Sequence, residues 1–287
     1  MGGNSRVIGV DIGGTKVAAA VVSQGANGLE VIGEAVVVPT RAAEGFDVSF
    51  GQVCQAIDAC LGAQDLASIG ICAPGPLNPK TGVVINPPNL PGWVNVPLAE
   101  LVAGRYGMMC RVENDANAAG LAEALFGAGR GYSNVFYVTL STGVGAGIIL
   151  DGKIYHGRNG AAAEGGHVTI DYRSSSICIC GVPGCIEALA SGSAILRRGQ
   201  DPAALTAEQF EEVTTMLGAW LGSVVSLLDP DVIVVGGGMT RIGEPLFAAL
   251  RAKMPRWTIN QFASGTPIVK AAFVDQCGIL GAASVVL

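Results

Sequence analysis

The stretch VIGVDIGGTKVAAAVV, residues 7–22, places a short loop between two apolar segments. Residues 7–10 and 17–22 have the composition of buried strands, and the loop between them contains two glycines and a threonine. The stretch VFYVTLSTGVGAGIIL, residues 135–150, repeats this plan nearly half a chain length later, with serine, threonine and glycine in its loop. Repetition on this scale predicts two similar lobes.

Both repeated loops have a composition suited to phosphate. Gly13, Gly14 and Thr15 offer backbone amides and a hydroxyl to phosphate oxygens, and Lys16 adds a positive charge. Asp11 is an acid suited to a magnesium ion. The loop is not a P-loop, because the Gly-x4-Gly-Lys-Ser/Thr spacing is absent. A plain hairpin turn is the alternative, since Gly-Gly is common there, but the repetition favours phosphate binding.

A second informative stretch contains one histidine and three cysteines in about twenty residues, a set typical of a structural zinc site. The four are His167, Cys178, Cys180 and Cys185. Buried free thiols beside a hydrogen-bonded histidine are the alternative, since this cysteine spacing is not among the commonest zinc spacings. Glu164 and Glu187 lie within three residues of these ligands, so a metal would also fix both carboxylates, turned toward a bound molecule.

Composition limits the class of protein. Half of the 287 residues are apolar and 14% are charged, which predicts a folded core. The net charge of -6 argues against nucleic acid as a partner. No apolar run approaches the ~20 residues of a membrane span, and no signal-peptide pattern is present. We therefore expect a cytoplasmic protein with no membrane partner. The remaining five cysteines are expected to be buried free thiols: Cys54, Cys60, Cys72, Cys110 and Cys277.

The rest of the chain alternates predicted strands and helices. Strands are predicted at residues 29–38, 69–73, 110–113, 148–150, 153–155, 232–235 and 268–273. Helices are predicted at residues 48–61, 116–125, 206–228 and 278–286, with another beginning near residue 243. A glycine-rich turn is expected at residues 24–28. The proline-rich residues 74–79 and 86–93 are expected to be loops, either rigid surface connections or ligand contacts.

Two further positions are candidates for chemistry. Asp115 falls where a strand meets a helix, so it is either a helix N-cap or a carboxylate that accepts a proton. Gly236, Gly237 and Gly238 follow a buried strand, where glycines allow a nucleotide to approach the backbone closely. A Rossmann motif is not favoured, because the Gly-x-Gly-x2-Gly pattern is not met.

Taken together, these motifs resemble those of the ROK family of bacterial sugar kinases, within the hexokinase and actin ATPase superfamily. The resemblance covers nearly the whole chain. It rests on the motifs at residues 11–16, 113–117, 140–145, 164–167, 178–187 and 236–238. The cysteine run with its preceding histidine is specific to the family, whereas the other motifs are shared more widely.

The resemblance implies an α/β protein with two ribonuclease-H-like lobes, the actin-like ATPase fold, and an interlobe cleft. Residues 1–115 and 275–287 would form the N-terminal lobe. Residues 116–274 would form the C-terminal lobe with its zinc-binding insertion. ATP, Mg²⁺ and a hexose would bind in the cleft, and a homodimer or homotetramer is expected.

The resemblance also implies roles for individual residues. Asp115 would be the base that takes the proton of the attacking sugar hydroxyl. The sugar would contact Asn114, Glu164, His167, Glu187 and the backbone of Gly75, and Asn89 is a further candidate. His167 would serve zinc with one ring nitrogen and sugar with the other. Asp11 would hold Mg²⁺ through water. Phosphate would face Gly13, Gly14, Thr15, Lys16, Thr142 and Gly143, and adenosine would face Gly237 and Gly238.

The favoured hypothesis is therefore an ATP-dependent hexose kinase acting at the 6-hydroxyl, with glucose as substrate. N-acetylmannosamine, N-acetylglucosamine, fructose and allose are alternatives, and polyphosphate is a less favoured donor. A sugar-responsive repressor is the rival from another class, but such proteins carry a winged-helix domain ahead of the first strand, where only residues 1–6 stand here. A sugar-binding module without catalysis is the third hypothesis.

Overall fold

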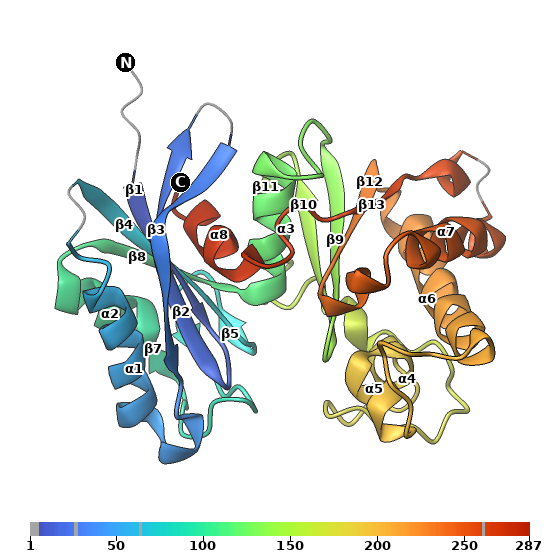
Figure 1. The fold of residues 1–287 in the computed structure, drawn as a ribbon, viewed down its shortest axis with the longest axis horizontal. Coiled ribbons are helices and arrows are strands. Elements are labelled where there is room, and N and C mark those ends of the chain that lie inside the picture. Colours follow the sequence, from blue (N-terminus) through green and yellow to red (C-terminus); the bar gives the residue numbers. More distant parts are fainter. Residues whose placement is uncertain (1–5, 26–27, 63–64, 260–261) are drawn as a thin grey trace. The chain divides into compact units, whose positions relative to one another are not determined.

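The two repeated stretches each form the central hairpin of a five-stranded sheet in the computed structural model of the chain (Figure 1). The structure describes residues 6–25, 28–62, 65–259 and 262–287. The expected turn at residues 24–28 includes two positions, 26 and 27, that lie outside the described residues, as do residues 1–5.

The first sheet has the strand order β3-β2-β1-β4-β8. β1 (Arg6–Ile12) pairs antiparallel with β2 (Lys16–Gly25), which pairs antiparallel with β3 (Gly28–Pro39). On its other side β1 runs parallel to β4 (Leu66–Ala73), and β4 runs parallel to β8 (Met109–Asn114). The carboxyl ends of three parallel strands therefore share one edge, the usual place for a ligand in such sheets.

The second sheet repeats this order and these directions as β11-β10-β9-β12-β13. β9 (Asn134–Leu140) and β10 (Val144–Leu150) form the hairpin, followed by β11 (Lys153–Ile154). β12 (Val232–Gly236) runs parallel to β9, and β13 (Ile268–Lys270) runs parallel to β12. The predicted repeat and the α/β fold class are confirmed.

The chain divides into two compact units. The first unit contains Met1–Ala122, His156–Ala161 and Asp275–Leu287. The second unit contains Glu123–Tyr155 and Ala162–Val274. Helix α3 (Asp115–Phe126) begins in the first unit and ends in the second. The assignment of residues 1–115 and 116–274 to functional lobes stays a prediction.

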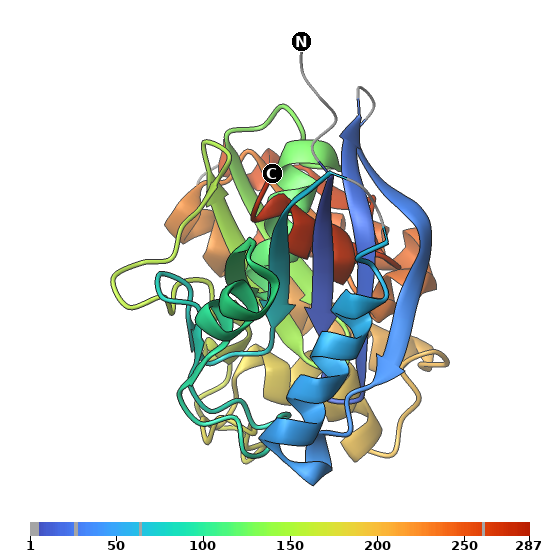
Figure 2. The ribbon, with the colours of Figure 1, turned by 90° about the vertical axis from the view of Figure 1, so that its left-hand side faces the viewer.

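In the first unit, helices cover both faces of the sheet. α1 (Phe46–Asp58) lies in front of the strands in Figure 2, and α8 (Cys277–Ser284) lies behind them. α2 (Leu98–Tyr106) packs with α1 on the same apolar core. The small residues of α8 permit close packing, because a methyl group at Gly9 or Gly70 would collide with the backbone of α8.

In the second unit, α6 (Ala207–Leu228) and α7 (Glu244–Lys253) share the main apolar core with the sheet. α4 (Ile186–Ala190) packs against α6, and α5 (Gly192–Arg197) follows α4 directly. Residues 206–209 read Thr-Ala-Glu-Gln, a pattern that predicts a capping box, and the Thr206 and Gln209 side chains form one at the start of α6.

The remaining elements are short. The proline-rich region contains three two-residue strands, β5 (Leu77–Asn78), β6 (Val83–Val84) and β7 (Val96–Pro97), where only loop was expected. The 3-10 helices are η1 (Ala42–Glu44), η2 (Gly165–His167), η3 (Gly238–Ile242), η4 (Met254–Trp257) and η5 (Ala263–Gly265). Among the described helices none combines the length and apolarity needed to cross a bilayer.

Two sequence-based expectations need correction. β13 ends at Lys270 rather than at residue 273, because the buried Glu123 carboxylate accepts the amides of Ala272 and Phe273 at 3.0 and 2.7 Å. Of the five thiols expected to be buried, Cys110 and Cys277 are partly exposed, although all eight cysteines are free. Cys277 begins α8 and Cys110 lies in the edge strand β8, so neither is enclosed on all sides.

Candidate functional site

The first glycine loop is a tight turn between β1 and β2. The Gly13 amide donates to the Lys16 carbonyl at 2.9 Å. Thr40 engages the carbonyls of the loop, donating from its hydroxyl to Gly13 at 2.6 Å and from its amide to Thr15 at 3.0 Å. Gly14, Thr15 and Lys16 remain exposed. The loop therefore presents amides, a hydroxyl and a cation, which suit an anion.

Asn89 lies directly against this loop. A methyl group at Gly14 would sit 3.0 Å from the Asn89 carbonyl oxygen and 3.1 Å from its Cβ. A side chain at position 14 would therefore require Asn89 to shift. The structure brings together two candidates that the sequence separates by 75 positions, one assigned to phosphate and one to sugar.

Asp11 lies at the carboxyl end of β1, in register with Cys72 of β4. The Cys72 thiol donates to Asp11 Oδ1 at 3.3 Å. Burial raises the pKa of Asp11, while the Cys72 hydrogen bond and the Lys16 charge act in the opposite direction. Gly278 of α8 packs on the Asp11 carboxylate so closely that any side chain there would collide with it.

Asp115 lies at the same edge of the first sheet as Asp11. Cys72 is in register with Glu113 of β8, two residues before Asp115. Burial raises the pKa of the Cys72 thiol well above its ordinary value, and the charges of Asp11 and Asp115 raise it further. Both carboxylates therefore lie near one buried thiol, and the edge carries concentrated negative charge that a divalent cation would offset.

Asn114 caps helix α3. Its Oδ1 accepts the amides of Ala116 at 3.0 Å and Asn117 at 3.3 Å. Asp115 is the first residue of the helix, and its Oδ1 accepts the Ala116 amide at 2.8 Å. The capping role considered for this junction thus falls mainly to Asn114. Gly75 lies close by, since a methyl group on it would be 3.6 Å from Asn114 Nδ2.

One pair of residues near this helix was not found from the sequence. His156 Nε2 lies 2.7 Å from Glu113 Oε2, and the Glu113 side chain is only 4% exposed. The two residues are 43 positions apart. A charged residue near the end of an apolar strand was the only available signal, and it did not identify the partner.

The second glycine loop occupies the same place in the second sheet as residues 13–15 in the first. The Ser141 amide donates to the Gly143 carbonyl at 2.9 Å. The first residues of α5 hold the loop in place. The amides of Gly192 and Ser193 donate to the Ser141 and Thr142 carbonyls at 2.8 and 3.0 Å. As in the first loop, the loop carbonyls accept hydrogen bonds from the protein itself. Backbone amides of the loop and the Thr142 hydroxyl are thereby left to face a ligand.

Gly237 and Gly238 lie beside this second loop. Gly237 has a φ of 85°, and a side chain on it would collide with the backbone of Leu140. A methyl group on Gly238 would approach the Ser141 hydroxyl at 3.9 Å. The structure therefore gathers Thr142, Gly237 and Gly238 just beyond the carboxyl ends of β9 and β12, and the missing side chain at position 237 lets this turn pack against Leu140.

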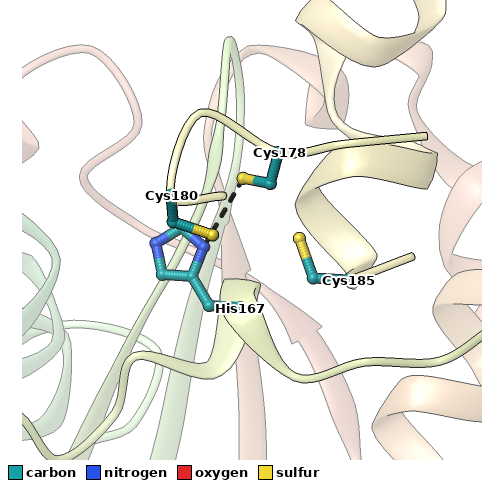
Figure 3. Close-up of side chains that lie close together, drawn as sticks. All are labelled: His167, Cys178, Cys180 and Cys185. Atoms are coloured by element: carbon teal, nitrogen blue, oxygen red, sulfur yellow. Dashed lines mark hydrogen bonds between the residues drawn. The ribbon is translucent and has the colours of Figure 1, made fainter. Parts of the chain in front are cut away.

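The predicted zinc ligands converge on one point (Figure 3). One ligand atom from each of the four side chains lies within 4.8 Å of the others, and His167 Nδ1 lies 3.7 Å from Cys178 Sγ. Zn–S bonds of about 2.3 Å place sulfurs about 3.8 Å apart in a tetrahedral site. The geometry fits zinc. The four ligands are His167, Cys178, Cys180 and Cys185.

Glu187 connects this cluster to the second glycine loop. Its Oε2 accepts the Val144 amide at 2.9 Å, and its Oε1 accepts the Cys178 thiol at 3.2 Å. Cys185 is the N-cap of α4, so Glu187 lies in the first turn of a helix that begins at a ligand. A methyl group at Gly143 would be 2.6 Å from Glu187 Oε2.

The two ring nitrogens of His167 face different neighbours. Its Nδ1 faces Cys178, and its Nε2 lies 3.7 Å from Glu164 Oε2. The Glu164 side chain is 58% exposed, which leaves its carboxylate available to a polar ligand. The two ring nitrogens therefore face different groups, and the expectation that one serves zinc and the other serves sugar stays a prediction.

These features agree with the comparisons with known proteins. A model of the ROK family matches residues 7–287. The chain belongs to the ROK family. A glucokinase from Thermotoga maritima is 32% identical, with 98% of this chain and 97% of that protein covered. Membership of the family, expected from the motifs, is confirmed.

Two solved structures of ROK proteins are similar over nearly the whole chain. A ROK hexokinase from Thermus thermophilus has a TM-score of 0.83 at 32% identity, with 97% of each chain covered. A ROK family glucokinase from Streptomyces griseus, solved in complex with glucose and AMPPNP, has the same TM-score and identity over 98% of this chain and 99% of that chain.

Proposed function

We propose that this ROK protein is an ATP-dependent hexose kinase that phosphorylates the 6-hydroxyl, with glucose as its preferred substrate. The glucokinase relatives and the structure with glucose and a nucleotide analogue support this substrate pair. The observation that carries the proposal is the edge of the first sheet, where Asp11 and Asp115 flank Cys72 beside an exposed glycine loop.

In this proposal the two glycine loops hold the phosphates of ATP. Lys16 and the amides of Gly14 and Thr15 supply positive charge at one loop, and Thr142 and Gly143 do so at the other. Gly237 and Gly238, beside the second loop, border adenosine in this proposal. Asp11 holds Mg²⁺ through water, and the bound ion would neutralise charge that develops on the transferred phosphoryl group.

Asp115 is proposed as the general base. A hexose hydroxyl is a weak nucleophile, and phosphoryl transfer depends on its alignment and on removal of its proton. Asp115 has one oxygen engaged by the Ala116 amide, which fixes the carboxylate at the start of α3. The other oxygen would accept the proton of the 6-hydroxyl as that oxygen attacks the terminal phosphorus.

The sugar is proposed to contact acids and amides that can fork onto neighbouring hydroxyls. Asn114 and Asp115 lie at the start of α3, Gly75 lies close to Asn114, and Asn89 lies against Gly14 of the first glycine loop. The other contacts come from Glu164, His167 and Glu187, which the zinc ligands would hold in place. Polar groups of this kind favour a sugar over an apolar alcohol.

The proposal is tested by ADP release with a panel of hexoses and amino sugars. Glucose is expected to give the highest kcat/KM, ahead of fructose, allose, N-acetylglucosamine and N-acetylmannosamine. A higher kcat/KM with one of these would overturn the substrate assignment. Binding of a sugar without turnover of any would favour a sugar-binding regulator. We also expect a homodimer or homotetramer in the cytoplasm, which size measurements and localisation would check.

A further inference from the structure

We propose that His156 is a positioning residue for phosphoryl transfer, acting through Glu113 on the turn that carries Asp115. The inference rests on the proposed role of Asp115 as base. It starts from the 2.7 Å contact between His156 Nε2 and Glu113 Oε2. An ionised carboxylate only accepts hydrogen bonds, so His156 Nε2 donates in this contact.

Glu113 uses both of its oxygens. Oε1 accepts the Asn114 amide at 2.9 Å and the Asn117 side-chain amide at 3.1 Å, while Oε2 accepts His156. The carboxylate therefore holds the residue before Asp115 and a residue in the first turn of α3. With a side chain 4% exposed, it depends on these donors rather than on water.

Loss of the His156 donor would leave one oxygen of a buried carboxylate unsatisfied. Glu113 would then rotate toward another donor, and this change would weaken its hold on the Asn114 amide. Asn114 caps α3, so movement of Asn114 would displace Asp115 by tenths of an ångström or more. Proton transfer is sensitive to displacements on this scale.

The chain around His156 supports a specific role for the contact. Residues His156–Ala161 belong to the first unit, although the residues before and after them belong to the second. Gly160 of this segment lies against Pro79, where a methyl group would approach Pro79 Cδ at 2.9 Å. The segment is followed by Glu164, a proposed sugar ligand, so an anchoring role is the alternative that the experiment has to separate from positioning of Asp115.

A purely structural role would make a different prediction. If His156 only anchored its segment, its removal would weaken sugar binding and thermal stability together. If it positions Asp115, its removal would lower kcat more than it changes the dissociation constant for glucose measured without nucleotide. A glutamine, whose amide can still donate to Glu113, would restore much of the kcat.

The experiment compares His156→Phe, His156→Gln and Arg158→Gln in the full-length protein. Arg158 is exposed in the same segment and serves as the matched control. We expect His156→Phe to lower kcat about tenfold or more, with the glucose dissociation constant changed less than about threefold. His156→Gln is expected to stay within about threefold of wild type, and Arg158→Gln to be unchanged.

A double-mutant cycle with Glu113→Gln completes the test. The inference predicts that His156→Phe costs little further kcat when Glu113 is already Gln. The inference would be overturned if the two substitutions lowered kcat by independent factors that multiply in the double variant. A wild-type kcat in His156→Phe would also overturn it. If His156→Phe does not fold, the same cycle is measured with His156→Asn. A wild-type protein that releases no ADP with any sugar would instead overturn the proposed function.

Discussion

Glu187 Oε2 accepts a hydrogen bond from the Val144 amide at 2.9 Å, and this contact joins the cysteine cluster to the second glycine loop. Glu187 lies two residues after the candidate zinc ligand Cys185, in the first turn of α4. A metal that fixes the start of α4 would therefore also fix the residue after Gly143. Loss of zinc is expected to affect both the sugar and the phosphate contacts.

The first prediction concerns zinc. Protein prepared without added metal is expected to contain about one zinc per chain by elemental analysis. Cys180→Ser should lower this content and the melting temperature, because Cys180 is exposed and contributes mainly through the metal. Cys110→Ser, at a cysteine outside the cluster, is the control. Zinc-free protein with unchanged stability after chelation would contradict the assignment.

The second prediction concerns Glu187 itself. In Glu187→Gln the amide oxygen can still accept from Val144, so the glycine loop should stay in place. The lost charge should raise the KM for glucose about tenfold or more, with the KM for ATP changed much less. Glu212→Gln, at an exposed position of α6, is the control. An equal rise in both KM values would show that Glu187 acts on the loop alone.

The third prediction concerns packing of α8 on the first sheet. Gly9→Ala should destabilise the protein by about 1–3 kcal/mol, because the added methyl group collides with the backbone of Ile279. Gly51→Ala should instead stabilise by about 0.5–1 kcal/mol, since Gly51 is exposed within α1 and has open space around it. Denaturant unfolding measures both. A neutral Gly9→Ala would contradict the close packing.

The fourth prediction concerns Asp11 and pH. Burial raises the pKa of this carboxyl in the folded protein, so the folded state binds its proton more tightly than the unfolded state. Stability from this group is complete below the unfolded pKa near 3.8 and is lost as pH rises through the folded pKa. Asp11→Asn should therefore raise the melting temperature more at pH 7 than at low pH, while abolishing Mg²⁺-dependent turnover.

The outcome for Asp11 can be checked by thermal unfolding of wild type and variant across the acidic range. An increment in melting temperature that does not grow with pH would mean that the Asp11 carboxyl carries no cost in the folded protein. Asp47→Asn, an exposed acid in the first turn of α1, is the control and should show no such growth.

Much of the fold could be predicted because it follows local patterns. The strands at residues 7–10 and 135–140 are mainly apolar, and the repeated plan of strand, glycine loop and strand predicts two similar lobes. The capping box at Thr206 is likewise a short-range signal and was found where expected. The end of β13 was not predictable, since it depends on Glu123, which lies nearly 150 positions earlier.

The candidate site likewise contains features that the sequence predicts and features that it does not. The glycine loops and the cysteine cluster are compact in sequence, so their composition indicated a ligand directly. The contact of His156 with Glu113 and the approach of Asn89 to Gly14 depend on how distant segments pack. Neither the hydrophobic periodicity nor the motif spacing of a sequence predicts contacts of this kind. The shared position of Asp11 and Asp115 beside Cys72 follows from strand order, which only the sheet reveals.

The measurement that tests the central claim most directly is turnover by Asp115→Asn with glucose and ATP, alongside glucose binding by calorimetry. The account predicts that kcat falls about 100-fold to 10,000-fold, as expected for loss of a general base, while glucose binding changes little. Turnover by Asp115→Asn at a rate close to wild type would contradict the account.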